Sequence, residues 1–191
     1  TSGDRLLGLF APSGMSRALD RDAETPSLEE MMNTALQTLN RNPQGFFLMM
    51  EASQVDWAAH GNSVAGVISE MEGFINAVDK VLEFAGANGD TLVVIVADHE
   101  TGGMSLGKDG SYSWDPRPLR GIKATPAAMT MSYLEGEEPL SSIVAANVPF
   151  ELTDTETSIL DATERDEKAT FDAIAALFND RTGTGWSTGS H

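Results

Sequence analysis

Residues 45–60 read GFFLMMEASQVDWAAH, and this stretch decides the fold that we expect for the chain. Its apolar run, Phe46 to Met50, has the length of a buried strand and follows a glycine. Three side chains of the kind that bind metal ions come next, namely Glu51, Asp56 and His60. A strand that leads directly into carboxylates and an imidazole predicts a ligand site at its carboxyl end.

A second apolar run ends in the same way. Residues 91–97, TLVVIVA, show no alternation, as is expected of a strand covered on both faces, and they lead into Asp98, His99 and Glu100. Because the carboxyl ends of parallel strands meet at one edge of a sheet, the two runs predict a metal site on a parallel sheet. Glu100 either orients a ligating histidine or is a solvated turn residue, and we favour the second interpretation.

Helical patterns separate the two predicted strands. Ser27 and Glu30 form the pattern of a capping box, which predicts a helix that ends at residues 42–43, Asn-Pro. An apolar stripe at helical spacing over residues 64–85 predicts a second, longer helix. The order helix, strand, helix, strand predicts an α/β fold with right-handed crossovers.

The second half of the chain has a different pattern. Short helices are expected after Thr125, after Thr153 and over residues 166–179. Residues 135–167 are rich in acids and predict a solvent-facing segment. We therefore expect one domain, residues 1–191, with a surface insertion at about residues 108–184.

The composition limits the class of protein. The chain carries 29 acidic and 12 basic residues, a formal net charge of −17, and nucleic-acid binding is not expected because it requires a basic surface. The acids are spread along the chain, as on an ordinary solvated surface, and adaptation to high salt is the alternative. No apolar run approaches the ~18 residues of a membrane span. There is no cysteine, so zinc would have to be held by histidine and carboxylates.

The three histidines of the chain have neighbours that favour metal binding. His60 follows Asp56 at i+4, which places both side chains on one face of a helical turn. His99 follows Asp98 directly, and His191 follows a glycine-rich stretch. Imidazole and carboxylate ligands suit Zn²⁺, whereas carboxylates alone suit Mg²⁺. The pattern therefore predicts a zinc site at the aspartate–histidine pairs.

Three segments together, GFFLMMEASQVDWAAH, TLVVIVADHETGG and TGWSTGSH, resemble the C-terminal half of bacterial alkaline phosphatases of the zinc and magnesium type. The resemblance covers essentially the whole chain, LLGLF near its start included, and the E-x4-D-x3-H and strand-Asp-His motifs are highly specific. It implies a three-layer α/β/α sandwich with a central, mostly parallel sheet. Residues 1–191 would form the C-terminal, metal-binding part of that domain.

The resemblance also implies which residues bind the metals. The family has two zinc ions about 4 Å apart, with a magnesium beside them. The implied ligands are Asp56, His60 and His191 for the first zinc, Asp98 and His99 for the second zinc, and Glu51 for the magnesium. The first zinc would activate the water that hydrolyses a phosphoserine, and the second would activate the serine nucleophile. The implied reaction is hydrolysis of phosphate monoesters, which releases inorganic phosphate.

Other parts of the family's site are not found in this sequence. No serine stands in an Asp-Ser-Ala context and no arginine lies near the motifs, so the nucleophile and the phosphate-binding arginine are expected in an N-terminal half that precedes residue 1. Trp57 stands where other members carry Lys or His, so a contact with phosphate is expected to be missing or replaced. The resemblance further implies a homodimer and a periplasmic or secreted location.

Two alternatives to a phosphatase remain open. One is a metal-binding fragment or subunit with no catalytic activity of its own. The other is a metal-dependent phosphodiesterase or mutase related to the alkaline phosphatases. Upstream sequence distinguishes the second alternative, because an Asp-Ser-Ala motif favours the phosphatase and a threonine nucleophile favours the relatives.

Overall fold

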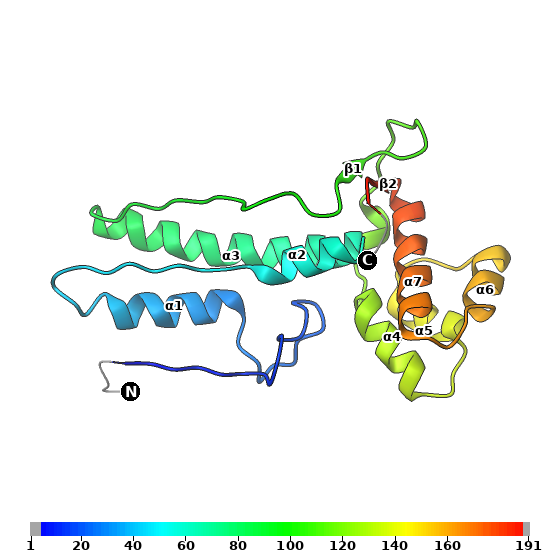
Figure 1. Cartoon of the computed structure of the whole chain (residues 1–191), viewed down its shortest axis with the longest axis horizontal. Helices are drawn as coiled ribbons and strands as arrows, with labels where there is room; N and C mark the ends of the chain where they lie inside the picture. Colours follow the sequence, from blue (N-terminus) through cyan, green and yellow to red (C-terminus); the bar gives the residue numbers. More distant parts are fainter. Residues whose placement is uncertain (1–4, 189–191) are drawn as a thin grey trace.

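The computed structural model describes residues 5–188, which are mostly helical (Figure 1). The elements in chain order are α1 (Leu28–Leu39), α2 (Ser53–His60), α3 (Val64–Asn88), β1 (Met104–Leu106), a 3₁₀ helix η1 (Arg117–Leu119), α4 (Pro126–Glu135), α5 (Leu140–Asn147), α6 (Asp154–Asp161), α7 (Glu167–Thr182) and β2 (Thr184–Trp186). Helices α1 to α3 form an elongated layer, and α4 to α7 form a compact cluster at one end of it. Within residues 5–188, no helix has the length and apolar character needed to cross a membrane.

Hydrogen bonds at the helix ends explain where the helices begin. The Ser27 hydroxyl accepts from the amide of Glu30 at 3.1 Å, and the Glu30 carboxylate accepts from the amide of Ser27 at 2.8 Å. This confirms the predicted capping box of α1. Thr153 and Glu156 form a second box at α6, and Ser63 caps α3 through its side chain. These helices begin at these residues because a capping side chain bonds amides within one turn of it in the sequence.

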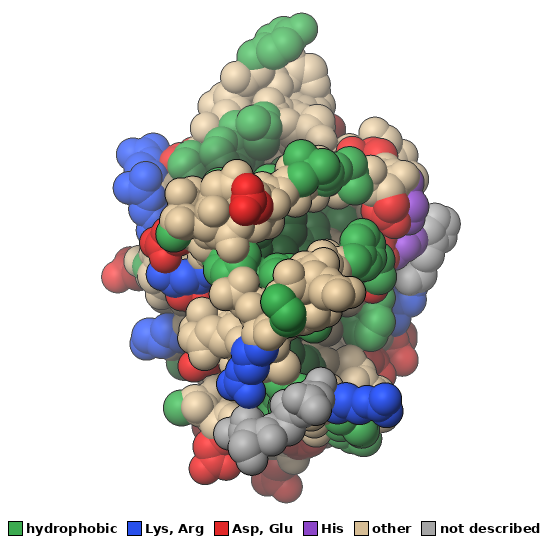
Figure 2. Space-filling view, turned by 90° about the vertical axis from the view of Figure 1, so that its left-hand side faces the viewer, with side chains coloured by type: hydrophobic (Ala, Val, Ile, Leu, Met, Phe, Trp, Pro, Cys, Tyr) green, Lys and Arg blue, Asp and Glu red, His purple; other side chains and the backbone are tan. Residues whose placement is uncertain are grey.

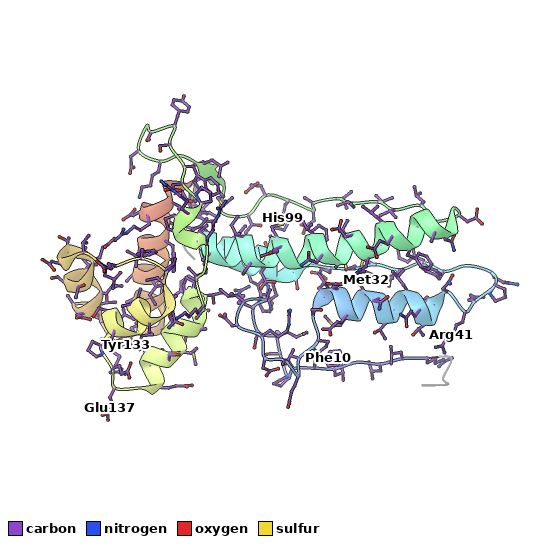
Figure 3. All side chains as sticks on the ribbon, turned by 180° about the vertical axis from the view of Figure 1, so that it is seen from behind. Phe10, Met32, Arg41, His99, Tyr133 and Glu137 are labelled. Carbon is purple, nitrogen blue, oxygen red and sulfur yellow. The ribbon has the colours of Figure 1, made fainter. Side chains whose placement is uncertain are left out.

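The helical cluster contains the largest hydrophobic core of the described residues. Buried side chains from α4, α5, α6 and α7 meet there, with Phe178 of α7 fully enclosed and edge-on to Phe150 at a ring-centroid distance of 6.3 Å. Val64 and Ala65, from the first turn of α3, belong to the same core. Helix α3 therefore joins the cluster to the layer, where its later turns pack on α1 around Met32 (Figure 3). That residues 108–184 are an insertion into a larger fold stays a prediction.

The predicted strand at residues 46–50 is not part of a sheet in this structure. Its first, third and fifth side chains pack against the core between α1 and α3, whereas Phe47 and Met49 are 88% and 75% exposed. This alternation is typical of a strand with one covered face. Strand pairing also needs a neighbour whose amide and carbonyl groups face the segment, and the part of the chain that the structure describes provides none here.

The predicted strand at residues 91–97 is likewise unpaired, and the described residues leave both of its faces exposed, so the expected coverage stays a prediction. The segment runs as an extended chain beside α3, with Leu92, Val94 and Val96 exposed. Residues 5–10 are a third extended segment with exposed apolar side chains. We call residues 5–10, 46–50 and 91–97 the unpaired segments. Figure 2, which faces one end of the layer, shows apolar side chains lying open on its surface.

The one sheet within residues 5–188 is antiparallel and is formed by other residues than the predicted parallel sheet, which stays a prediction. It consists of β1 and β2, with Met104 opposite Trp186. Two further hydrogen bonds extend the contact, because the amides of Ser187 and Thr188 donate to the carbonyl of Gly102 at 3.0 and 3.2 Å. The sheet therefore holds the end of the described chain against the loop that follows residues 91–97.

An ion pair between α6 and α7 should make the free energy of unfolding depend on pH in acid. Arg181 Nε donates to Glu156 Oε1 at 2.6 Å, which, together with the capping bonds from Thr153, lowers the pKa of Glu156 from 4.5 to about 2. A carboxyl group with a lowered folded-state pKa stabilises the fold above its unfolded pKa and loses that contribution as pH falls from about 4.5 towards 2. Urea unfolding measured across this range should therefore show stability falling with pH.

Replacing Glu156 with glutamine keeps the capping bonds and removes the charge. We expect Glu156→Gln to flatten that part of the pH profile and to lower the free energy of unfolding at pH 7 by about 1 kcal/mol. Glu137→Gln is the matched control, because Glu137 is exposed at the end of the molecule (Figure 3). Equal profiles for Glu156→Gln and the unchanged chain would contradict the assignment.

Candidate metal centre

Helix α2 presents Asp56 and His60 one turn apart, as their spacing predicted. His60 Nε2 lies 3.6 Å from Asp56 Oδ1, and both side chains are partly open to solvent. The helix follows Ala52, which makes no side-chain capping bond, and it ends at His60 with Gly61 as its cap. The pair therefore lies over the last turn of α2, where solvent reaches both side chains.

Asp98 and His99 form the second pair, at the end of the unpaired segment 91–97. His99 Nε2 lies 3.2 Å from Asp98 Oδ2, and His99 Nδ1 lies 3.2 Å from the carbonyl oxygen of Glu100. A carbonyl can only accept, so Nδ1 carries the proton and, in the neutral ring, Nε2 has a lone pair. A lone pair and a carboxylate oxygen this close repel each other unless a proton or a cation lies between them.

Thr101 brings the two pairs together. Its hydroxyl donates to Asp56 Oδ1 at 2.7 Å, and its oxygen lies 3.2 Å from His99 Nδ1. In Figure 3, His99 lies where the chain after residues 91–97 passes over the helices of the layer. Thr101 was not among the candidate residues predicted from the sequence. A hydroxyl two residues after a candidate ligand was the available signal, and hydroxyls are too common in turns for it to stand out.

The remaining predicted ligands are not joined to these pairs by the described residues. Glu51 is exposed just before α2. Across residues 5–188, no three His, Asp or Glu side chains lie close enough together to hold a metal ion. His191 lies outside the described residues. Thr188, three positions earlier, is held close to both pairs, because its carbonyl accepts from Asn62 Nδ2 at 2.6 Å and its amide donates to Gly102.

The charge around the two pairs fits a cation. In the described part of the chain, neither Asp56 nor Asp98 forms an ion pair with a lysine or arginine. The ionisable side chain beside each of these carboxylates is a histidine. Two carboxylates and two imidazoles are a donor set that suits Zn²⁺. Each pair provides two of the three or four ligands that a zinc site needs. The residue types therefore suit zinc, and further ligands are needed to complete each site.

The side chain of Glu100 does not orient a histidine. Its carboxylate accepts from the amide of Gly103 at 3.2 Å and closes the turn, which confirms the interpretation that we favoured. Its backbone carbonyl is the group that faces the His99 ring. Trp57 lies half-exposed against Gly14, where a Cβ atom would come within 2.4 Å of the indole ring.

A half-buried arginine supports α2 from the side of the N-terminal loop. Arg17 Nη1 donates to the carbonyl of Gln54 at 2.8 Å, and Gln54 Nε2 donates to the carbonyl of Met15 at 2.8 Å. Burial lowers the pKa of Arg17 and raises the pKa of the neighbouring Glu70 carboxyl, which accepts from the amide of Ala18 at 2.7 Å. These contacts fix the first turn of α2 and hence the position of Asp56.

Comparisons with known proteins place the chain in a family. A family model described as alkaline phosphatase matches residues 1–191. Alkaline phosphatase 4 of Bacillus subtilis is 40% identical over 189 residues, which cover 98% of this chain and 41% of that protein. Alkaline phosphatase 3 of the same organism is 42% identical over 192 residues, with the same coverage.

A solved structure is also similar. The crystal structure of a cold-active alkaline phosphatase from the psychrophile Shewanella sp. superposes with a TM-score of 0.88 at 34% identity, over 96% of this chain and 46% of that one. The chain thus spans less than half the length of each of these relatives. The chain belongs to the alkaline phosphatase family.

Proposed function

We propose that this chain supplies most zinc ligands of a metal centre that hydrolyses phosphate monoesters. One observation carries the proposal: the Asp56–His60 and Asp98–His99 pairs, distant in sequence, meet through Thr101 at one place on the surface. Asp56 and His60, with His191, would hold one zinc ion, and Asp98 and His99 the other. Three residues span at most about 10 Å, which lets His191 reach the first pair from the anchored Thr188.

A magnesium ion is the third expected cation. Glu51 stands on the chain between the segment 46–50 and α2, and its exposed carboxylate has the oxygen ligands that Mg²⁺ prefers. Further magnesium ligands would come from outside residues 5–188. Three bound cations would also offset the net charge of −17 where an anionic substrate has to approach.

The residues of this chain would act by holding and orienting. Bound zinc supplies Lewis acidity towards phosphoryl oxygens and lowers the pKa of water. Asp56 and Asp98 would contribute negative charge that keeps the cations in place, and His60 and His99 would contribute neutral nitrogen ligands. The Glu100 carbonyl and the Thr101 hydroxyl fix the direction of the His99 ring. The serine that forms the phosphoserine and the arginine that binds phosphate would come from the remainder of the protein.

The unpaired segments support a larger fold around this chain. Residues 5–10, 46–50 and 91–97 are extended and keep apolar side chains exposed, which is costly unless other strands and a further layer cover them. We therefore propose that the missing N-terminal half completes a three-layer α/β/α sandwich with a mostly parallel sheet. A homodimer and a periplasmic or secreted location are proposed on the family relationship alone.

Hydrolysis of p-nitrophenyl phosphate at alkaline pH tests the function. We expect the complete protein to turn over this substrate with zinc and magnesium present, and EDTA to abolish turnover, because the ligand pairs need cations to act. Residues 1–191 alone should bind zinc and show no turnover, since they lack the nucleophile. EDTA-resistant hydrolysis by the complete protein would contradict the metal centre.

The same assay separates the alternatives. The incomplete ligand set within residues 5–188 favours a metal-binding fragment as the second candidate function. A complete protein that binds zinc and hydrolyses no phosphoester would support that candidate. Faster cleavage of bis-p-nitrophenyl phosphate than of the monoester would support a related phosphodiesterase.

A further inference from the structure

The direction of the hydrogen bonds at Thr101 follows from the chemistry of its partners. An ionised carboxylate only accepts, so the single hydroxyl proton of Thr101 goes to Asp56 Oδ1 at 2.7 Å. The Thr101 oxygen is then an acceptor towards His99 Nδ1, 3.2 Å away. The Glu100 carbonyl, 3.2 Å from Nδ1, can also only accept, so it too requires the proton on Nδ1. The chain of donors therefore runs from the His99 ring through the Thr101 hydroxyl to the Asp56 carboxylate.

This polarity leaves ligand atoms free on both sides. His99 keeps an unprotonated Nε2, which faces Asp98. Thr101 uses one lone pair of Asp56 Oδ1. Among residues 5–188, Asp56 Oδ2 accepts no hydrogen bond, so its lone pairs remain available to a metal ion. Histidines that bind metals commonly donate their other ring N–H to an acceptor in this way, which sets the tautomer and the ring orientation.

The turn that carries Thr101 is fixed against α2. Gly102 has a φ of 78°, and a Cβ atom there would lie 2.6 Å from the carbonyl oxygen of Ala59 and 2.9 Å from the Trp186 ring. Its own carbonyl accepts from the amides of Ser187 and Thr188. The backbone at Thr101 is therefore held between α2 and the end of the described chain, which makes the hydroxyl a fixed point between the two pairs.

We propose that Thr101 is a positioning residue that orients His99 and Asp56 together, so that the two zinc sites depend on one hydroxyl. This inference rests on the proposed metal centre. Because Thr101 touches one ligand from each pair, its loss should weaken both sites, whereas a hydroxyl that served one ligand would weaken one. Asp56 and Thr101 are partly buried, which strengthens the bond between them relative to a bond in water, whereas the His99 ring is exposed.

Two substitutions separate the hydroxyl from the methyl group. Thr101→Val keeps the volume and removes both hydrogen bonds, and Thr101→Ser keeps the hydroxyl and removes the methyl group. We expect Thr101→Val to lower zinc affinity at both sites by about 10- to 100-fold and Thr101→Ser to stay near the unchanged protein. Affinity is measured on the complete protein by competition with a chromophoric chelator, with circular dichroism as the check on folding.

Thr163→Val is the distant control, because its hydroxyl bonds only a backbone carbonyl in α6. Unchanged zinc affinity in Thr101→Val, or an equal loss in Thr101→Ser, would overturn the role of the hydroxyl. A loss confined to one of two bound zinc ions would overturn the coupling. An unchanged protein that binds no zinc at all would overturn the metal centre itself, and the positioning role with it.

Discussion

Replacing His99 with alanine is expected to lower phosphate monoester hydrolysis by the complete protein by more than about 100-fold, and to remove one zinc ion. Loss of a residue that only orients a metal ligand costs about 10- to 100-fold in many sites, and His99 is proposed as a ligand itself. Its ring lies between Asp98 and Thr101, so the substitution removes a nitrogen ligand from the second pair and a hydrogen-bond partner from Thr101. Zinc content after dialysis and turnover of p-nitrophenyl phosphate are the two measurements.

The neighbouring acid provides the matched control for His99. Glu100→Gln keeps the side-chain bond to Gly103 and the backbone carbonyl, so zinc content and turnover should remain those of the unchanged protein. Full zinc content in His99→Ala would show that the second pair does not bind the metal. The hydrolytic function could then survive only with a different ligand set.

Replacing Phe178 with alanine is expected to lower the free energy of unfolding by about 3–5 kcal/mol. The ring is fully enclosed in the core of the helical cluster, and large-to-small changes at such positions lose both buried area and packing. For a chain of this size the loss corresponds to a fall of roughly 10 °C in Tm. Thermal unfolding followed by circular dichroism gives the value.

Tyr112 provides the contrast to Phe178. Its ring is fully exposed on the loop after β1, so Tyr112→Ala should change the free energy of unfolding by less than about 0.5 kcal/mol. Similar Tm values for the two variants would mean that the α4–α7 cluster unfolds before the rest of the chain and does not determine its stability.

Structural features that depend on residues close together in the sequence were predicted correctly. The helices after Ser27, Ser63, Thr125 and Thr153 begin where their caps indicated, because capping acts within one turn. The shared face of Asp56 and His60 was predicted for the same reason, since i+4 spacing fixes it within α2. The metal roles of these residues stay predictions.

Features that depend on distant segments either were missed or stay predictions. Residues 91–97 have the composition of a buried strand, but burial needs partners that residues 5–188 do not provide. Strands β1 and β2 have three residues each, too few for a periodic pattern. Thr101 gains its partners only when the chain returns to α2, so no spacing in the sequence could reveal it.

The open apolar face of residues 91–97 has a consequence for the chain inside a cell. TLVVIVA combines β-branched residues with the absence of charge and proline, which is the composition of segments that stack into amyloid-type fibrils. While Leu92, Val94 and Val96 remain uncovered, the segment is a template for edge-to-edge aggregation of identical copies. Prompt coverage of this segment, by the rest of the protein or by a chaperone, therefore decides between productive folding and precipitation.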